Sequence, residues 1–338
     1  MLQKPYLLFL GEITDKSRAK MALSAEYFCP KDCIGFHKLP KCSVELDMPE
    51  LSLESAKESG AKSFVIGVVN NGGYIEDAWI PTIVAAMNLG FDIVNGMHAK
   101  LEAVCVADQA KTLGQLASEL GVQLHNVRYS SVDLPVGNGQ KRAGKRLLTV
   151  GTDCSSGKMF TTLHLHNALE KKGVDSHFVA TGQCGVLVSG EGIAIDAVGA
   201  DFISGAVEYM TPDTDGLYLI EGQGSLFHPA YAGVSLGLLH GAQADYLIMC
   251  HDVSRKTLKN FDYPIPDIQA CIALNAQLGR LTNDACQCIG VSLNTSSMTE
   301  SAAQAYCHEL RDRLQLPVTD PNRFGVDSLV AALQERGV

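Results

Sequence analysis

The residues from Gly151 to Met159, GTDCSSGKM, have the composition of a loop that holds phosphate groups. The β-branched run LLTV precedes them and a helical pattern follows, so the glycines stand where a strand turns into a helix. In that context main-chain amides, the helix N-terminus and Lys158 can converge on one anion. The predicted anion-binding residues are Gly151, Thr152, Cys154, Ser155, Ser156, Gly157, Lys158 and Met159. A turn without a ligand is the alternative, but it leaves Lys158 without a packing role.

The spacing of this loop differs from the common motif in two respects. Gly151 and Gly157 are separated by one residue more than usual, and this longer form resembles the loop of dethiobiotin synthetase and its relatives. Met159 follows Lys158 at the position where NTPases carry the Ser or Thr that binds Mg²⁺. Compared with the NTPase motif, this loop keeps the groups that bind an anion and lacks the hydroxyl that binds Mg²⁺. This favours a cofactor that is held by its diphosphate and not cleaved.

Groups that can move a proton follow the apolar run LYLI. Glu221 comes directly after it, and Ser225 and His228 follow in a glycine-containing segment. Ligands of parallel sheets bind beyond the carboxyl ends of the strands, so we expect this segment to lie on the same rim as the loop. We predict catalytic roles for Glu221, His228 and Asp153, since a carboxylate or imidazole can deprotonate an attacking group. Capping by Glu221 and a turn at His228 are the alternatives.

Polar residues after other predicted strands are candidates for holding a substrate. Arg255 offers a carboxylate two parallel donors, and the amide of Asn294 can donate to and accept from an adenine edge. Asn70, Asn71 and Gly72 follow a strand in the first half. The predicted substrate-binding residues are Asn70, Asn71, Gly72, Ser225 and Arg255. Turns and solvated loops are the alternatives for these positions.

Cys154 lies at the start of the helix that follows the loop, where we expect its thiol pKa to be lowered. This leaves open an acyl-cysteine route, although no histidine neighbours Cys154 in sequence.

The elements that must position these residues alternate along the chain as short β-branched runs and helical patterns, which predicts an α/β fold with parallel sheets covered on both faces. The segment LPVGNGQKRAGKR has no hydrophobic period and predicts a linker. We predict a Rossmann-like domain over 1–133, a linker over 134–145 and a P-loop NTPase-like domain, a doubly wound parallel sheet, over 146–338. Strands are expected at 5–10, 33–37, 63–69, 91–95, 123–129, 146–150, 177–181, 217–221, 246–250, 287–294 and 316–319.

Charge, hydropathy and cysteine usage argue against several classes of protein. The 338 residues carry 27 basic and 37 acidic side chains, which argues against a nucleic-acid partner. No stretch is apolar for the ~20 residues that a membrane helix needs. The eleven cysteines complete no zinc pattern, so no metal site is predicted, and they favour a reducing compartment. We expect a cytoplasmic homo-oligomer without a membrane partner.

The segments GTDCSSGKM, EGQGSLFHPAYAGVSLGLLHG and GVSLNTS, with NNGG and NGMH in the first half, resemble the D-glutamate N-acetyltransferase family. The resemblance covers nearly the whole chain. It implies acetyl transfer from acetyl-CoA, as cosubstrate, to the amine of an amino acid, D-glutamate, on a P-loop fold. Two alternatives stay open: an ATP- and Mg²⁺-dependent ligase or kinase akin to dethiobiotin synthetase, and a non-catalytic nucleotide-binding regulator.

Overall fold

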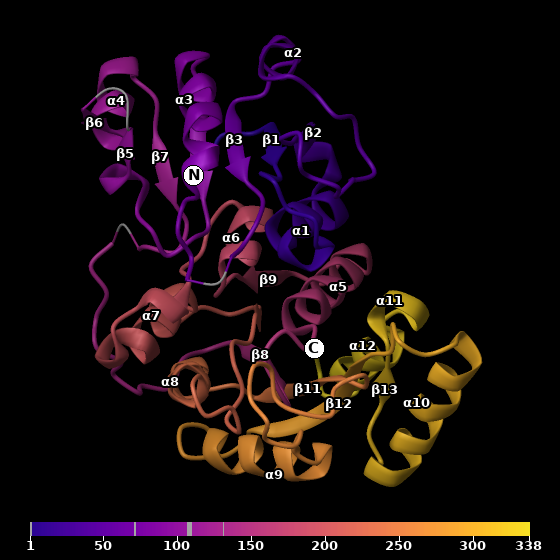
Figure 1. Ribbon diagram of the computed structural model, residues 1–338. Helices are drawn as coiled ribbons and strands as arrows, with labels where there is room; N and C mark the ends of the chain where they lie inside the picture. The colour runs from indigo at the N-terminus through magenta and orange to yellow at the C-terminus, as the bar shows by residue number, and fades with distance from the viewer. Residues whose placement is uncertain (1, 71, 107–109, 131) are drawn as a thin grey trace. The chain divides into compact units, whose positions relative to one another are not determined.

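A computed structural model describes residues 2–70, 72–106, 110–130 and 132–338. The chain forms two compact units (Figure 1). The first comprises Met1–Ser131 with Gly182–Ala197, and the second comprises Val132–Thr181 with Val198–Val338. The segment Gly182–Ala197 therefore packs with the first unit although it follows a strand of the second. The predicted domain limits, with a linker over 134–145, stay a prediction. They include Gly182–Ala197 in the second domain, whereas this segment packs with the first unit.

The first unit is built on a five-stranded parallel sheet in the order β2-β1-β3-β4-β7. Its strands are β1 (Tyr6–Phe9), β2 (Cys33–His37), β3 (Ser63–Ile66), β4 (Asp92–Asn95) and β7 (Leu124–Asn126). The strands β5 (Cys105–Val106) and β6 (Lys111–Thr112) form a separate antiparallel pair. The helices are α1 (Lys20–Phe28), α2 (Leu53–Glu58), α3 (Ile80–Asn88), α4 (Leu113–Leu120) and α6 (Gln183–Ser189).

Local sequence explains where these elements begin and end. All four residues of β1 and of β3 are buried, as expected for parallel strands covered on both faces. Helix α4 begins with a capping box in which Thr112 and Gln115 each bind the other's main-chain amide. The same helix ends at Gly121, whose left-handed conformation suits glycine.

The second unit is built on a six-stranded parallel sheet in the order β13-β12-β11-β8-β10-β9. Its strands are β8 (Lys145–Gly151), β9 (Ser176–Val179), β10 (Leu217–Ile220), β11 (Tyr246–Asp252), β12 (Gln287–Asn294) and β13 (Val318–Thr319). Its helices are α5 (Lys158–Lys171), α7 (Ile203–Met210), α8 (Ala232–Ala242), α9 (Ile268–Gly279), α10 (Glu300–Leu314), α11 (Pro321–Phe324) and α12 (Asp327–Gln334). Short 3₁₀ turns across the two units cover Lys16–Arg18, Pro30–Asp32, Asp77–Trp79, Leu101–Ala103, Ile195–Ala197 and Ala200–Phe202.

Helices cover both faces of this second sheet. In Figure 1, α5 and α12 lie on one side of β11 and β12, and α9 lies on the other. The core on the first side joins Leu165 and Leu169 of α5 and Leu329 of α12 to Leu219 and Ile248 of the sheet. The predicted α/β class, with parallel sheets in a Rossmann-like and a P-loop unit, is confirmed.

The strand order places β8 in the middle of the second sheet, between β11 and β10. After β8 the chain moves to one side to form β9 and β10, and later to the other side to form β11, β12 and β13. Ligands of open α/β sheets bind at such a reversal, beyond the carboxyl ends of the strands. Each strand predicted from the sequence is present, most with shorter bounds. Among the described residues, no helix combines the length and the apolar character needed to cross a membrane.

Candidate functional site

The loop that leaves β8 curls around the side chain of Lys158. Ser155 and Gly157 have φ angles of 51° and 95°, and such positive angles turn successive amides towards one point. Gly151 has no room for a side chain: a Cβ atom there would lie 2.6 Å from Ser156 Oγ and 2.9 Å from Lys158 Nζ. The glycines at both ends of the loop are therefore required by its geometry.

Lys158 is buried inside this loop. Its Nζ donates to the main-chain oxygen of Asp153 at 2.8 Å and to Ser156 Oγ at 3.4 Å. Burial lowers the pKa of its ammonium from the ordinary value of 10.5. A phosphate group beside Lys158 would favour the charged form and offset this burial, which is how a P-loop lysine works.

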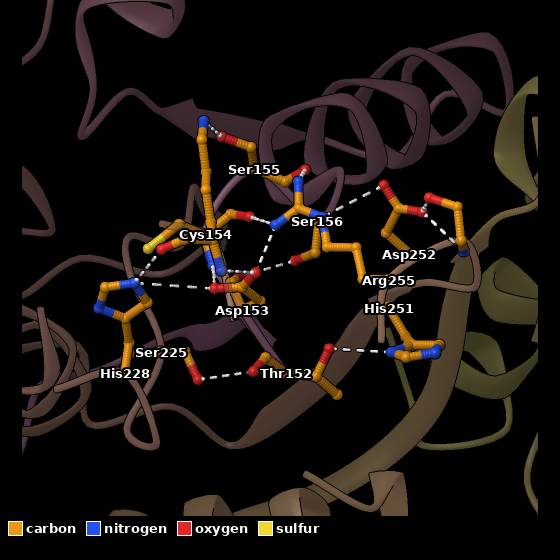
Figure 2. A network of polar contacts seen from close by, with 12 residues as sticks. Thr152, Asp153, Cys154, Ser155, Ser156, Ser225, His228, His251, Asp252 and Arg255 are labelled. Atoms are coloured by element: carbon orange, nitrogen blue, oxygen red, sulfur yellow. Dashed lines mark hydrogen bonds and ion pairs between the residues drawn. The ribbon is translucent and has the colours of Figure 1, made fainter. Parts of the chain in front are cut away.

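The carboxylate of Asp153 is buried and bound by three donors (Figure 2). The Cys154 amide donates to it at 2.7 Å, the Lys259 amide donates at 2.9 Å, and the guanidinium of Arg255 pairs with it. Asp153 therefore fixes the start of the loop, and its carboxylate is engaged by cationic and amide donors.

The side chain of Arg255, which follows β11, binds the phosphate loop at several points. Besides Asp153, its guanidinium donates to the main-chain oxygens of Cys154 and Ser155, the latter at 3.0 Å. Lys259, four residues further along the chain, donates from Nζ to Ser155 Oγ at 3.1 Å. The structure thus brings Arg255, predicted to bind substrate, onto the loop itself. Its contact with a substrate carboxylate stays a prediction.

Glu221 follows β10 and is buried next to the loop. Its Oε2 accepts from the Thr181 amide at 3.0 Å, and its Oε1 accepts from Gln223 Nε2 at 3.1 Å. The next residue, Gly222, packs so closely that a Cβ atom would lie 2.9 Å from Lys158 Cδ. Glu221 therefore contacts the turn after β9 and lies one residue from the glycine that packs on Lys158.

Both ring nitrogens of His228 are engaged by the main chain. Nδ1 accepts from the Ala230 amide at 3.2 Å, and Nε2 lies 3.1 Å from the carbonyl oxygen of Lys259. A carbonyl can only accept, so Nε2 carries the proton and the ring is the neutral Nε2–H tautomer. Nε2 also lies 4.0 Å from Asp153 Oδ1. His228 therefore supports the loop, and in this conformation it offers no lone pair to a substrate.

The thiol of Cys154 behaves differently from the sequence expectation. Burial raises its pKa, and this outweighs the nearby Lys158, Lys259 and Arg255 that favour the thiolate. The predicted lowering of its pKa is wrong, because burial is set by tertiary packing.

Cys154, Asp153 and His228 also bring potential metal-ligating atoms within 4.8 Å of one another. The Asp153 carboxylate is already paired with Arg255, and Lys158 lies on the same loop. These cations make the group better suited to an anion than to a metal ion.

The other loop side chains have structural partners. Thr152 Oγ1 lies 2.9 Å from His251 Nδ1, and Ser225 Oγ donates to the Thr152 carbonyl at 3.1 Å. Thr161, two residues after Met159, donates its hydroxyl to the Gly157 carbonyl. The same hydroxyl lies 2.7 Å from Ser292 Oγ of β12, so it does not replace the one that Met159 lacks.

Asn294 ends β12, the neighbour of β11. Its Nδ2 donates to Asp252 Oδ2 at 3.3 Å, and its Oδ1 accepts from the Ser296 amide at 3.2 Å. Both ends of the amide have protein partners. The adenine contact predicted for Asn294 stays a prediction.

The predicted residues of the first unit form a loop after β3. Asn70 Nδ2 donates to the Tyr74 carbonyl at 2.9 Å and its Oδ1 accepts from the Tyr74 amide at 3.1 Å, so this side chain closes the loop. Gly72 has a φ of 95°, which suits glycine. Asn71 lies outside the described residues. A substrate contact from these residues stays a prediction.

Sequence reasoning missed two partners of the site. Lys259 was not singled out, although it follows Arg255 in the same segment after β11. Thr181, which binds Glu221 through both its amide and its hydroxyl, gave no signal beyond its place after a strand.

Comparisons with known proteins agree with this architecture. The family model described as "Domain of unknown function (DUF1611_C) P-loop domain" matches residues 135–330, and the "Domain of unknown function (DUF1611_N) Rossmann-like domain" matches residues 39–130. A protein of Tritonibacter scottomollicae named D-glutamate N-acetyltransferase is 43% identical over 98% of this chain and 99% of its own. One of a Pseudoalteromonas species with the same name is 44% identical, with the same coverage.

A solved structure is also similar over the full length. The crystal structure of a DUF1611 family protein from Anabaena variabilis covers 98% of this chain and 100% of its own. Its TM-score is 0.86, at 30% sequence identity.

Proposed function

The chain belongs to the D-glutamate N-acetyltransferase family, whose two domains were described as DUF1611, and on this premise we propose that it transfers the acetyl group of acetyl-CoA to the amine of D-glutamate. The membership confirms the resemblance noted in the sequence. The donor, the acceptor and the roles of individual residues are the proposal.

The observation that carries the proposal is the buried Lys158 inside a loop without the usual magnesium hydroxyl. Such a loop suits the diphosphate of coenzyme A, since amides and an ammonium can hold that group throughout the reaction. Met159 takes the position of the Mg²⁺-binding Ser or Thr, which supports a held donor over a cleaved nucleotide.

Glu221 is the general base in this proposal. The ammonium of an amino acid must lose a proton before its nitrogen can attack a thioester carbonyl. Glu221 is a buried carboxylate next to Gly222, which packs on the Lys158 side chain, whereas both ring nitrogens of His228 bind the main chain. One ammonium proton passes to Glu221, and the free amine then forms the N–C bond. As the C–S bond breaks, the nitrogen loses its second proton and the departing thiolate takes up one, so coenzyme A leaves as the thiol and one proton is released to solvent. Asp153 and His228 position the loop.

The amino-acid carboxylates need donors, and we carry forward the predicted set as part of the proposal. Arg255 and Ser225 lie at the loop. Asn70 and Gly72 lie in the loop after β3, and Asn71 lies outside the described residues.

Mass spectrometry of reactions with acetyl-CoA and a panel of D- and L-amino acids tests the proposal. We expect N-acetylglutamate from D-glutamate, much less product from a Lys158→Met variant at limiting acetyl-CoA, and free coenzyme A in equal amount to the product. Isothermal titration gives an independent check. Tight ATP–Mg²⁺ binding without acetyl-CoA binding would overturn the proposal and favour a ligase or kinase.

A cytoplasmic location and a homo-oligomeric state also stay predictions. Fractionation of the native host and light scattering of the purified protein would test them.

A further inference from the structure

The segment between β11 and α9 folds back on itself beside the phosphate loop. The amide of Leu258 donates to the Tyr263 carbonyl at 2.8 Å, and the amide of Ile265 donates to the Lys256 carbonyl at 2.9 Å. Thr257 and Pro264 form an antiparallel bridge. We call residues 255–265 the β11 hairpin. It carries Arg255 and Lys259, both of which bind the phosphate loop.

The hairpin and the segment after β10 expose a cluster of aromatic rings. Tyr231, Phe261 and Tyr263 are 46%, 37% and 60% exposed. The ring of His228 stacks on Tyr231 with centroids 4.6 Å apart and meets Phe261 edge-on at 5.1 Å. Phe261 and Tyr263 are 6.5 Å apart. We call Tyr231, Phe261 and Tyr263 the aromatic platform. Large rings gathered at a surface mark a binding site more often than single ones do.

The platform lies one side chain away from the phosphate loop. His228, which both Tyr231 and Phe261 contact, has its Nε2 4.0 Å from Asp153 Oδ1. Lys259 also connects the β11 hairpin to the phosphate loop, because its amide binds Asp153 and its ammonium binds Ser155 Oγ. A ligand whose diphosphate lies in the loop therefore meets a lysine and then exposed ring faces on this side.

The strand order separates the hairpin, with Phe261 and Tyr263, from Glu221. Tyr231 follows β10, as Glu221 does, and meets the hairpin ring of Phe261 through His228. The hairpin follows β11 and Glu221 follows β10, with β8 and its loop between them. A donor held by its diphosphate at the loop thus extends in two directions, with its thioester towards Glu221 and its nucleoside towards the hairpin.

We propose that the aromatic platform stacks the adenine of the acyl donor and that Lys259 binds the phosphate on the donor's ribose. This inference rests on the proposed function, and it specifies how the donor is recognised. Purine faces stack on aromatic side chains, and an ammonium beside them suits the charge that distinguishes coenzyme A from its dephosphorylated form.

Three donors separate the parts of this proposal: acetyl-CoA, acetyl-dephospho-CoA, and S-acetyl-4′-phosphopantetheine, which lacks the nucleoside together with one phosphate of the diphosphate. The platform variant is Tyr263→Ala, its stacking-competent partner is Tyr263→Phe, and Tyr209→Ala on α7 is a control at another exposed tyrosine. Affinity for coenzyme A is measured by titration, and kcat/KM is measured with each donor.

We expect Tyr263→Ala to weaken coenzyme A binding roughly tenfold or more, the range of base–aromatic stacking. Its kcat/KM with the nucleoside-free donor stays unchanged, and Tyr263→Phe and Tyr209→Ala resemble the wild type. Lys259→Ala abolishes the preference for acetyl-CoA over acetyl-dephospho-CoA.

The proposal that the platform stacks adenine would be overturned by an unchanged coenzyme A affinity in Tyr263→Ala. A tenfold loss of affinity in Asn294→Ala with none in Tyr263→Ala would also overturn it. Equal losses with all three donors would also overturn it, because the ring would then act through the loop and not on adenine. In each of these cases the wild type still acetylates D-glutamate. A wild type that neither binds coenzyme A nor transfers acetyl would instead refute the proposed function.

Discussion

Lys158 Nζ and the main-chain oxygen of Asp153 are joined by a 2.8 Å hydrogen bond across the phosphate loop. The ammonium is buried, and burial lowers its pKa. Between that lowered pKa and the ordinary 10.5, the unfolded chain binds more protons at this group than the folded chain does. The free energy of unfolding therefore rises with pH through this window.

Lys158→Met removes this ammonium and keeps much of the side chain's volume. We expect the variant to lose at least about tenfold in coenzyme A affinity, since hydrogen bonds to charged groups contribute about 1.5–3 kcal/mol. Its stability should lack the rise with pH that Lys158 gives the wild type. Urea unfolding at pH values from 7 to about 10 measures the difference. Parallel stability curves for the two proteins would contradict it.

Arg255 neutralises the buried carboxylate of Asp153, so its removal leaves a charge without its main partner. We expect Arg255→Ala to lower the free energy of unfolding by about 3 kcal/mol or more. Adding Asp153→Asn should restore part of that loss, because the amide needs no counter-charge. Urea unfolding of the single and double variants forms the test, and a double variant less stable than Arg255→Ala would refute it.

Glu221 and His228 should respond differently to substitution. Glu221→Gln keeps an oxygen for the Thr181 amide and removes the base, so kcat should fall about 10²- to 10⁴-fold with coenzyme A affinity unchanged. His228→Gln should reduce stability and coenzyme A affinity while the pH profile of kcat keeps the wild-type shape. Equal kcat losses and equal changes of profile in both variants would contradict this division.

Much of this architecture could be predicted from sequence, because buried parallel strands read as continuous apolar runs. The runs at Cys33–His37 and Gln287–Asn294 have the same bounds in the structure as in the prediction. The phosphate loop was found because its glycines and lysine follow such a run. What these patterns specify is local, namely a strand, a turn and the helix after it.

Features that depend on tertiary packing could not be found in this way. Arg255 and Asp153 lie 102 positions apart, and only the pairing of β11 with β8 brings them together. The thiol pKa of Cys154 follows burial by distant segments and not its place at a helix start. Gly182–Ala197 leaves the second unit after Thr181 although its sequence shows no boundary.

The raised thiol pKa of Cys154 predicts an unreactive thiol at neutral pH. Since the thiolate is the nucleophile, alkylation of Cys154 should become appreciable only above the ordinary pKa of 9.0. Cys154→Ala should keep kcat within a few-fold of the wild type, as direct attack by the amine requires. Peptide mapping after iodoacetamide treatment at several pH values measures the first effect. An acetylated Cys154 trapped with acetyl-CoA alone would establish the covalent route instead.

Gly222 and Gly233 offer a matched pair of Gly→Ala substitutions. A Cβ atom at Gly222 would lie 1.6 Å from the Thr149 carbonyl oxygen, so strand β8, Lys158 or Glu221 must move to admit it. At Gly233 in α8, no atom lies within 4 Å of the added carbon. We expect Gly233→Ala to stabilise the protein by about 0.4–1 kcal/mol through the unfolded state. Gly222→Ala should destabilise it by more than that and abolish acetyl transfer. Thermal unfolding measures the change in stability, and the D-glutamate assay measures acetyl transfer. Full activity in Gly222→Ala would contradict the proposed roles of Lys158 and Glu221, because one of them or strand β8 must have moved.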